Sequence, residues 1–366
     1  MQRKNLILGV LGILIIAAIF TIESSKPERT SSGTDDNVAV LSKTEKAARY
    51  EPAKEISTPD GFINTDSITL GEFIGKKVVL VDFWTYSCIN CQRTLPYLNA
   101  WYEKYADKGL VIIGLHTPEF EFEKKYENVT AAVKKFDIRY PVVLDNDYST
   151  WTAYKNRYWP RKYLVDIDGF IVYDHIGEGG YEDTERAMQA ALNERLQVLH
   201  SEGTIESPIA DPSGVATSGA QSPEVYFGAS RNEYLGNGTP GTTGITIFTN
   251  PPEIVPNTLY LTGTWNLEDE HAENVASGAK IIFRYRAKDV YFVAGSDAAN
   301  EIEIRIDGKP PTGILGDDLV MKSGRAIGTI REERLYRLIE GAASEEHTIE
   351  IIVKNPGLRT FTFTFG

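Results

Sequence analysis

The sequence predicts an α/β domain followed by an all-β sandwich or jelly-roll domain, with one transmembrane helix at the N-terminus. Three observations lead to this prediction. Between residues 51 and 200, continuous apolar runs alternate with helical patterns, as in a parallel or mixed sheet covered on both faces. Between residues 223 and 366 the hydrophobic period is two, with Gly, Pro, Asn and Asp between the runs. Residues 6–22 contain no charge.

The first fifty residues predict a membrane anchor and a tether. Arg3 and Lys4 precede the uncharged stretch, whose length is within the range of a spanning helix. No small-x-small cleavage site follows it, so we expect residues 1–22 to remain as a signal anchor. Because basic residues stay in the cytoplasm, the globular part is expected on the periplasmic or cell-wall side of the cell membrane. Residues 23–50 are polar and predict a flexible tether.

The α/β domain is expected to begin with a strand–helix–strand unit. Residues 61–70 indicate a hairpin, and residues 78–83, which are apolar except for Asp82, are typical of a buried strand. Residues 92–105 have a helical pattern, which Gly109 ends. A second apolar run at residues 110–116 predicts the next buried strand.

The same alternation continues to residue 200. Pro118 is suited to the first turn of a charged helix that runs to about Phe136. The remaining elements are a strand, a helix, a hairpin turning at Asp-Gly and a closing helix, expected at residues 140–145, 148–157, 163–173 and 182–200.

Residues 201–222 predict a linker, because Gly, Ser, Thr, Pro and Ala dominate there without any periodicity. The following domain, residues 223–366, shows almost no helical pattern. Its clearest strands are expected at residues 280–287, 289–294, 301–308, 347–353 and 359–365. With 366 residues and a net charge of −13, the chain has room for two domains with an acidic surface, which argues against nucleic acid as a partner.

The two cysteines of the chain, Cys88 and Cys91, are separated by two residues at the start of the expected helix. That spacing suits a reversible disulfide, and a helix N-terminus favours a thiolate at Cys88. Zinc would need about four ligands, and a second cysteine pair is absent, so we expect no metal. We predict a redox dithiol in which Cys88 attacks and Cys91 resolves, with no cofactor beyond the disulfide.

Residues around the dithiol resemble the thioredoxin superfamily, and more closely its exported, membrane-anchored thiol–disulfide oxidoreductases. Asp82, Trp84 and Pro96 match the family's buried carboxylate, neighbouring tryptophan and helix-bending proline. Trp159 and Pro160 match the site of its cis-proline. The resemblance implies that Asp82 accepts the Cys91 proton and that Pro160 faces the dithiol. The residues alone leave two alternatives open: Asp82 as a solvated carboxylate at the end of a strand, and Pro160 as an ordinary turn proline.

Two departures from thioredoxin itself limit what the resemblance implies. Ser87 stands where thioredoxin has a second tryptophan, and Ile89 and Asn90 replace Gly-Pro between the cysteines. The redox potential therefore does not follow from the resemblance.

A narrower resemblance, to the soluble part of DipZ-type proteins, covers nearly all of residues 51–366. It depends on residues 84–91, 116–123, 231–238 and 363–366. The resemblance implies a second domain similar to carbohydrate-binding modules. It also implies that electrons come from a separate membrane protein of the cytochrome c biogenesis type.

Further candidate site residues follow from their positions. Trp84, Tyr86 and Trp159 are expected to bind substrate beside Cys88, although Tyr86 and Trp159 fit core packing equally well. Glu119 and His116 follow the end of a strand, where sites in open sheets lie. Glu119 could assist proton transfer, but a glutamate facing a helix dipole needs no further role. Aromatic residues of the second domain suggest either a glycan platform or core packing: Tyr226, Tyr234, Trp265, Tyr285 and Tyr291.

The function predicted from these observations is an extracytoplasmic, membrane-tethered thiol–disulfide oxidoreductase that reduces or exchanges disulfides of exported proteins. A peroxiredoxin-like thiol peroxidase is the first alternative. Thr85 stands three residues before Cys88 as in that family, but Val81 occupies the position of its proline. A protein that binds glycan or a partner through the β domain is the second alternative.

Overall fold

The computed structural model describes residues 40–205, 208–212 and 220–366. The predicted anchor and most of the predicted tether lie outside the described residues. Within the described ranges, none of the helices combines the length and the apolar character needed to cross a membrane. Residues 41–366 form one compact unit.

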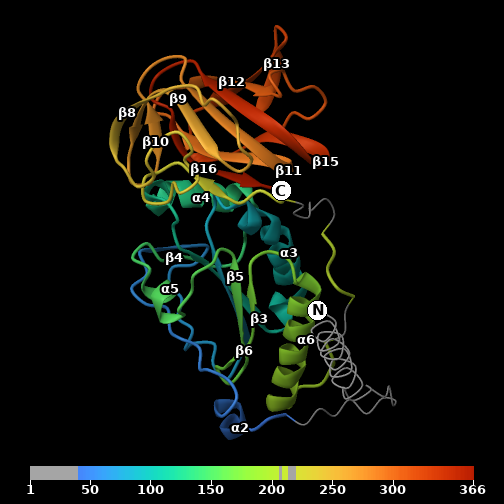
Figure 1. The fold of residues 1–366 in the computed structure, drawn as a ribbon. Helices are drawn as coiled ribbons and strands as arrows, with labels where there is room; N and C mark the ends of the chain where they lie inside the picture. Colours follow the sequence, from blue (N-terminus) through green and yellow to red (C-terminus); the bar gives the residue numbers. More distant parts are fainter. Residues whose placement is uncertain (1–39, 206–207, 213–219) are drawn as a thin grey trace, which may run out of the picture. The chain divides into compact units, whose positions relative to one another are not determined.

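The α/β domain is built on a six-stranded mixed sheet with strand order β1-β4-β3-β2-β5-β6 (Figure 1). Strands β2, β3 and β4 are parallel, and the other pairings are antiparallel. The predicted sheet is therefore confirmed. The strands are β1 (Gly61–Ile63), β2 (Val78–Trp84), β3 (Leu110–His116), β4 (Val142–Leu144), β5 (Arg161–Val165) and β6 (Ile171–Ile176).

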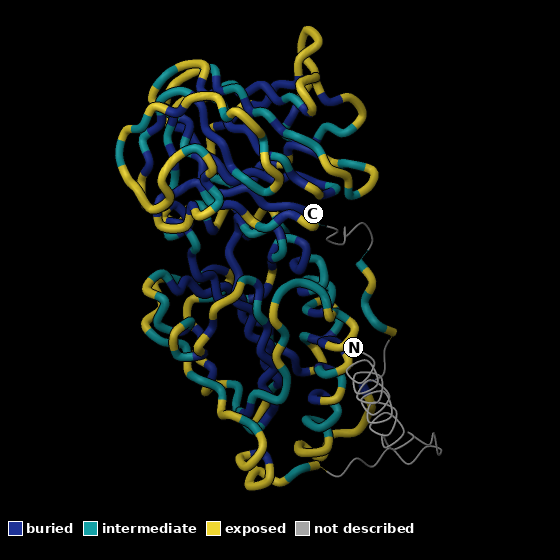
Figure 2. The backbone as a smooth tube through the Cα atoms, in the orientation of Figure 1, coloured by how far each residue is buried: buried dark blue, intermediate teal, exposed yellow. Residues whose placement is uncertain are grey.

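Helices cover both faces of this sheet. Successive residues of a strand point to opposite sides, and in β2 the residues on both sides are buried, so each face needs a covering layer. Leu80 packs with α3 (Ile89–Tyr105), α4 (Tyr126–Lys135) and α6 (Tyr181–Val198), whereas its neighbour Val81 packs with residues of α5 (Ser149–Ala153). The central strands are buried along their length (Figure 2). Their ends carry the loops that form the candidate site.

Two predicted elements of the α/β domain differ in the structure. The expected hairpin at residues 61–70 is reduced to β1, which pairs with β4. The expected helix at residues 118–136 is divided into a 3₁₀ turn, η2 (Glu121–Lys124), and α4. The division occurs because Phe120 and Phe122 turn into the buried core and Lys125 adopts an extended conformation.

Part of the predicted tether is ordered. Residues Lys43–Ala47 form a short helix, α2, whose Lys46 side chain is only 2% exposed. Its ammonium group pairs with the carboxylates of Asp166, Asp168 and Glu194. This ion-pair cluster holds α2 against the α/β domain.

The second domain is all-β, as predicted, and its pairings join the strands into one ten-stranded sheet. The two strands expected at residues 280–294 are one long strand, β11, with a register shift between Ala287 and Asp289. The strands are β7 (Val225–Tyr226), β8 (Gly244–Phe248), β9 (Leu259–Leu267), β10 (Ala272–Asn274), β11 (Lys280–Gly295), β12 (Asn300–Ile306), β13 (Leu319–Lys322), β14 (Arg325–Ile330), β15 (Arg334–Val353) and β16 (Arg359–Phe365).

The aromatic residues considered for a glycan platform do not form one. Trp265, Tyr285 and Tyr291 are at most 5% exposed, Tyr234 packs against the β-domain core, and the Tyr226 hydroxyl is bound to carboxylates. Core packing is therefore the correct interpretation of the three buried rings.

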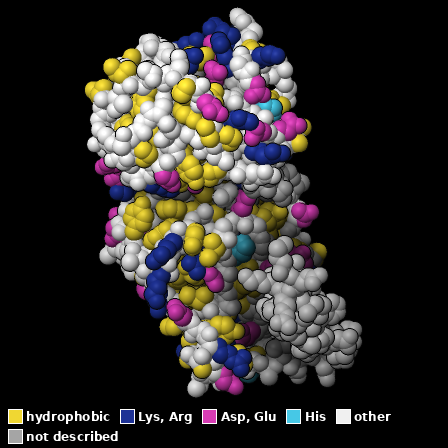
Figure 3. Space-filling model, viewed as in Figure 1, with side chains coloured by type: hydrophobic (Ala, Val, Ile, Leu, Met, Phe, Trp, Pro, Cys, Tyr) yellow, Lys and Arg dark blue, Asp and Glu magenta, His cyan; other side chains and the backbone are white. Residues whose placement is uncertain are grey.

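On the face shown in Figure 3, acidic and basic side chains are interspersed.

The two domains share buried apolar residues. Phe361 of β16 contacts Phe120 and Phe122, with ring centroids 5.1 and 4.8 Å apart. Tyr86 belongs to the same buried cluster as Leu335 of β15. The β domain therefore packs against the loops that surround the dithiol.

Candidate redox site

The dithiol lies at the N-terminus of α3, directly after the central strand β2. Cys88 is the N-cap residue, and its Sγ accepts a hydrogen bond from the Cys91 N–H at 3.3 Å. The Gln92 N–H donates to the Cys88 carbonyl at 3.0 Å and begins the helical ladder. The strand-to-helix connection thus presents the Cys88 Sγ at the helix end, within reach of a backbone N–H group that has no partner inside the helix.

The two sulfurs differ in exposure. Cys88 is half-buried, whereas Cys91 is 1% exposed. Burial, together with the neighbouring Cys88, raises the pKa of Cys91 well above its usual value. Both thiols are free. An accessible thiol beside a buried, protonated one is the arrangement that attack and resolution require.

Asp82 lies on β2 beneath the dithiol and is 1% exposed, so the alternative of a solvated strand-end carboxylate is wrong. Burial raises its pKa to about 7, and the charge of Lys162 opposes that rise. Its Oδ1 has no hydrogen-bond partner among the described residues. The charge of Asp82 also contributes to the raised pKa of Cys91. A buried carboxyl with this pKa can accept a proton near neutral pH.

Lys162 is a site residue that the sequence analysis missed. It pairs with Asp82 in the β2–β5 register and is completely buried, and its Nζ donates to the Gly177 carbonyl at 3.3 Å. Burial lowers the pKa of Lys162, while Asp82 and Cys91 oppose that change. Lys162 lies one residue before the hairpin expected at residues 163–173, and the observed strand β5 begins earlier, at Arg161, so the sequence pattern gave no signal for it.

Trp159 and Pro160 lie beside Cys88. The peptide bond between them is cis, and the Cys88 thiol is 3.9 Å from the Trp159 carbonyl oxygen. The Trp159 indole N–H donates to the Thr117 carbonyl at 2.9 Å, and its ring packs on Trp151 with centroids 4.3 Å apart. The half-buried Trp159 therefore forms part of the rim.

The other aromatic candidates occupy different positions. Trp84 is completely buried, so its predicted role in binding substrate is wrong, and it packs beneath the site. Its ring contacts the edge of His116, which stacks on Tyr86 with centroids 5.7 Å apart. Burial lowers the pKa of His116 to about 3. This histidine is therefore neutral at physiological pH and serves packing.

Glu119 is directed toward the β domain. Its Oε1 accepts hydrogen bonds from the Tyr226 hydroxyl and from Arg231 Nη1, each at 2.8 Å. The glutamate that is buried next to the dithiol is instead Glu123, which the sequence pattern did not single out. Its Oε1 accepts from the Ser87 hydroxyl at 2.6 Å, and burial raises its pKa to about 7.

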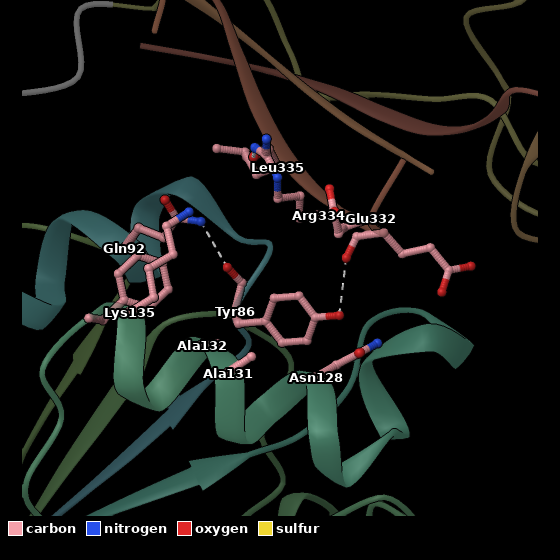
Figure 4. A pocket seen from close by; sticks show the side chains of 11 residues that line it. Tyr86, Gln92, Asn128, Ala131, Ala132, Lys135, Glu332, Arg334 and Leu335 are labelled. Atoms are coloured by element: carbon pink, nitrogen blue, oxygen red, sulfur yellow. Dashed lines mark hydrogen bonds between the residues drawn. The ribbon is translucent and has the colours of Figure 1, made fainter. Parts of the chain in front are cut away.

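A cavity of about 180 Å³ lies next to the dithiol turn, between α4 and the β14–β15 connection (Figure 4). The Tyr86 hydroxyl donates to the Glu333 carbonyl at 3.3 Å, and Gln92 Nε2 donates to the Tyr86 carbonyl at 2.8 Å. Figure 4 shows the Tyr86 ring in the middle of this region, beneath Arg334 and Leu335. Residues of both domains therefore form its walls.

Comparison with known proteins agrees with this geometry. A family model described as Redoxin matches residues 51–192, and one described as Thioredoxin like C-terminal domain matches residues 222–366. Protein DipZ of Mycobacterium tuberculosis is 35% identical over 319 residues, which cover 86% of this chain and 43% of DipZ. The chain therefore spans less than half the length of that relative.

Two shorter relatives match a smaller part of the chain. The thiol-disulfide oxidoreductase ResA of Bacillus cereus is 35% identical over 132 residues, which cover 35% of this chain and 73% of ResA. The thiol-disulfide oxidoreductase YkuV of Bacillus subtilis is 27% identical over 144 residues, covering 39% and 96% of the respective chains. The chain belongs to the thioredoxin-like thiol–disulfide oxidoreductase family.

Proposed function

We propose that this protein reduces or exchanges disulfide bonds of exported proteins through the Cys88–Cys91 couple. The observation that supports the proposal most is the placement of an accessible helix-cap thiol beside a buried thiol, above the buried carboxyl of Asp82. This arrangement supplies an attacking sulfur, a resolving sulfur and a proton acceptor in one place. The relatives ResA and YkuV are named for the same chemistry.

The catalytic cycle follows from these positions. The Cys88 thiolate attacks one sulfur of the target disulfide, and the other target sulfur leaves as a thiol after taking up a proton. Asp82 takes the Cys91 proton, and the Cys91 thiolate then attacks the mixed disulfide at Cys88. The target is released with both sulfurs reduced, and the two electrons come from the dithiol, which becomes a disulfide. The Trp159 carbonyl beside Cys88 and the cis Pro160 face the extended substrate segment.

The membrane setting is part of the same proposal. Residues 1–22 would anchor the protein, the following polar segment would space it from the membrane, and the domains at residues 51–200 and 223–366 would lie outside the cytoplasm. The uncharged stretch and the basic residues before it support this orientation. A separate membrane protein of the cytochrome c biogenesis type would return the dithiol to its reduced state. We further propose that the ten-stranded sheet of the β domain has a sandwich-like arrangement.

Insulin reduction by the purified full-length chain tests this function. With dithiothreitol as electron donor, we expect precipitation of the insulin B chain well above the rate with dithiothreitol alone. Hydrogen peroxide, supplied as the alternative substrate, should be consumed at the background rate. Peroxide turnover without insulin reduction would show that the thiol peroxidase alternative is correct and the proposed function wrong.

A further inference from the structure

Glu123 is a completely buried carboxylate that the catalytic cycle does not use. Its two oxygen atoms have different partners. Oε2 accepts the backbone N–H groups of Glu119 and Phe120, at 2.6 and 3.1 Å, and so closes the turn of its own segment. Oε1 accepts the backbone N–H and the hydroxyl of Ser87, at 3.2 and 2.6 Å. Closing the η2 turn needs only Oε2, so the two bonds to Ser87 require another explanation.

Ser87 directly precedes Cys88, so whatever holds Ser87 also fixes the start of α3. The Cys88 Sγ can accept the hydrogen bond from the Cys91 N–H only if Cys88 keeps its N-cap conformation, with φ −77° and ψ 118°. Ser87 is 2% exposed, and both of its donor groups are satisfied by one carboxylate oxygen. Two hydrogen bonds from one residue to a single buried oxygen fix that residue in place, so Glu123 has the position to set the direction of the Cys88 thiol.

The segment that carries Glu123 is itself held by the β domain. Glu119 is bound by Tyr226 and Arg231, and the Glu121 N–H donates to Glu270 Oε2 at 2.9 Å. Contacts of the β domain thus reach the dithiol turn through a short chain of hydrogen bonds. This path gives the β domain a structural link to the reactive sulfur that does not involve substrate.

We propose that Glu123 is a positioning residue that holds Cys88 in its reactive N-cap conformation through Ser87. The inference is additional to the proposed function and depends on it only for the turnover measurement. Glu123 does not touch the substrate or the sulfur. Its substitution should therefore slow the chemical step and leave substrate binding unchanged.

Glu123→Gln in the full-length chain tests this role, with Glu121→Gln as the matched control. Glu121 lies in the same segment, is 67% exposed and has no bond to Ser87. For Glu123→Gln we expect kcat for insulin reduction to fall about tenfold or more with KM within twofold, since small misplacements of reacting groups cost up to about 10²-fold. The rate of first alkylation by iodoacetamide should fall in parallel. The control should match wild type in all three.

Ser87→Ala provides a second, milder variant. It removes only the hydroxyl bond to Oε1, so kcat should fall about threefold, and the double variant should be no slower than Glu123→Gln alone because the two groups act as a unit. A folded Glu123→Gln protein with kcat and alkylation rate within twofold of the control would overturn the proposal. If Glu123→Gln does not fold, a wild-type rate in Ser87→Ala would overturn it instead. Alkylation needs no substrate, so this comparison decides the role of Glu123 even if the protein does not reduce insulin.

Discussion

Replacing Cys88 with alanine should abolish insulin reduction, bringing the rate down to that of the donor alone. Cys88 is the helix-cap thiol and the more accessible of the pair, so no other sulfur of this chain can begin the attack. Replacing Cys91 with alanine should have a different effect, because attack still occurs but resolution does not. Mixed disulfides with substrate should then accumulate and be visible on non-reducing gels.

The double variant Cys88→Ala/Cys91→Ala serves as the control, because it should neither react nor trap substrate. Equal trapping by the two single variants would mean that the roles of the cysteines are assigned wrongly. The difference in burial between the two sulfurs would then have no functional meaning.

Replacing Asp82 with asparagine should lower kcat by about 10²-fold at neutral pH, the lower end of the contribution of a positioned acid–base group. Asparagine cannot take the Cys91 proton, so the loss should fall on the resolution step. Mixed disulfide should therefore build up transiently in rapid-quench samples of the variant. An unchanged rate of resolution in Asp82→Asn would mean that Asp82 has no part in proton transfer.

The same substitution should change the pH dependence of folding stability. The pKa of Asp82 rises from 3.8 to about 7 in the folded protein, which corresponds to roughly 4 kcal/mol. Between pH 4 and pH 7 the folded protein keeps the Asp82 proton while the unfolded chain has lost it. The stability that is present below pH 4 is therefore lost as the pH rises through 7. Relative to wild type, Asp82→Asn should thus gain unfolding free energy between pH 4 and pH 8, measured by urea denaturation. The exposed Asp66→Asn should show no such gain, and equal curves for both variants would contradict the burial argument.

The sequence predicted the parts of this account that depend on local pattern. The continuous apolar runs identified β2 and β3, and the spacing of Cys88 and Cys91 identified the site, because neither depends on distant contacts. The resemblance to thioredoxins added Asp82 and Pro160. These inferences required only neighbouring residues or a known motif.

The residues that were missed depend on contacts between distant segments. Lys162 is important because strand pairing places it opposite Asp82, and Glu123 because a turn of the chain carries it to Ser87. Glu119 was the more obvious glutamate, yet it binds Arg231, which is over a hundred positions away in the sequence. The division of the helix expected at residues 118–136 has the same origin, since Phe120 and Phe122 pack against Phe361 of the other domain.

A redox titration of the intact chain shows whether Cys88 and Cys91 form a reversible two-electron couple. The full-length chain would be equilibrated over a range of ratios of reduced to oxidised dithiothreitol. Free thiols would then be blocked with an alkylating reagent and counted by mass spectrometry. We expect a single transition between a doubly alkylated and an unalkylated form, the same from either direction, with the strongly negative potential of a reductant. A pair that stays fully reduced at every ratio, or a bridge that forms only between chains, would contradict this expectation.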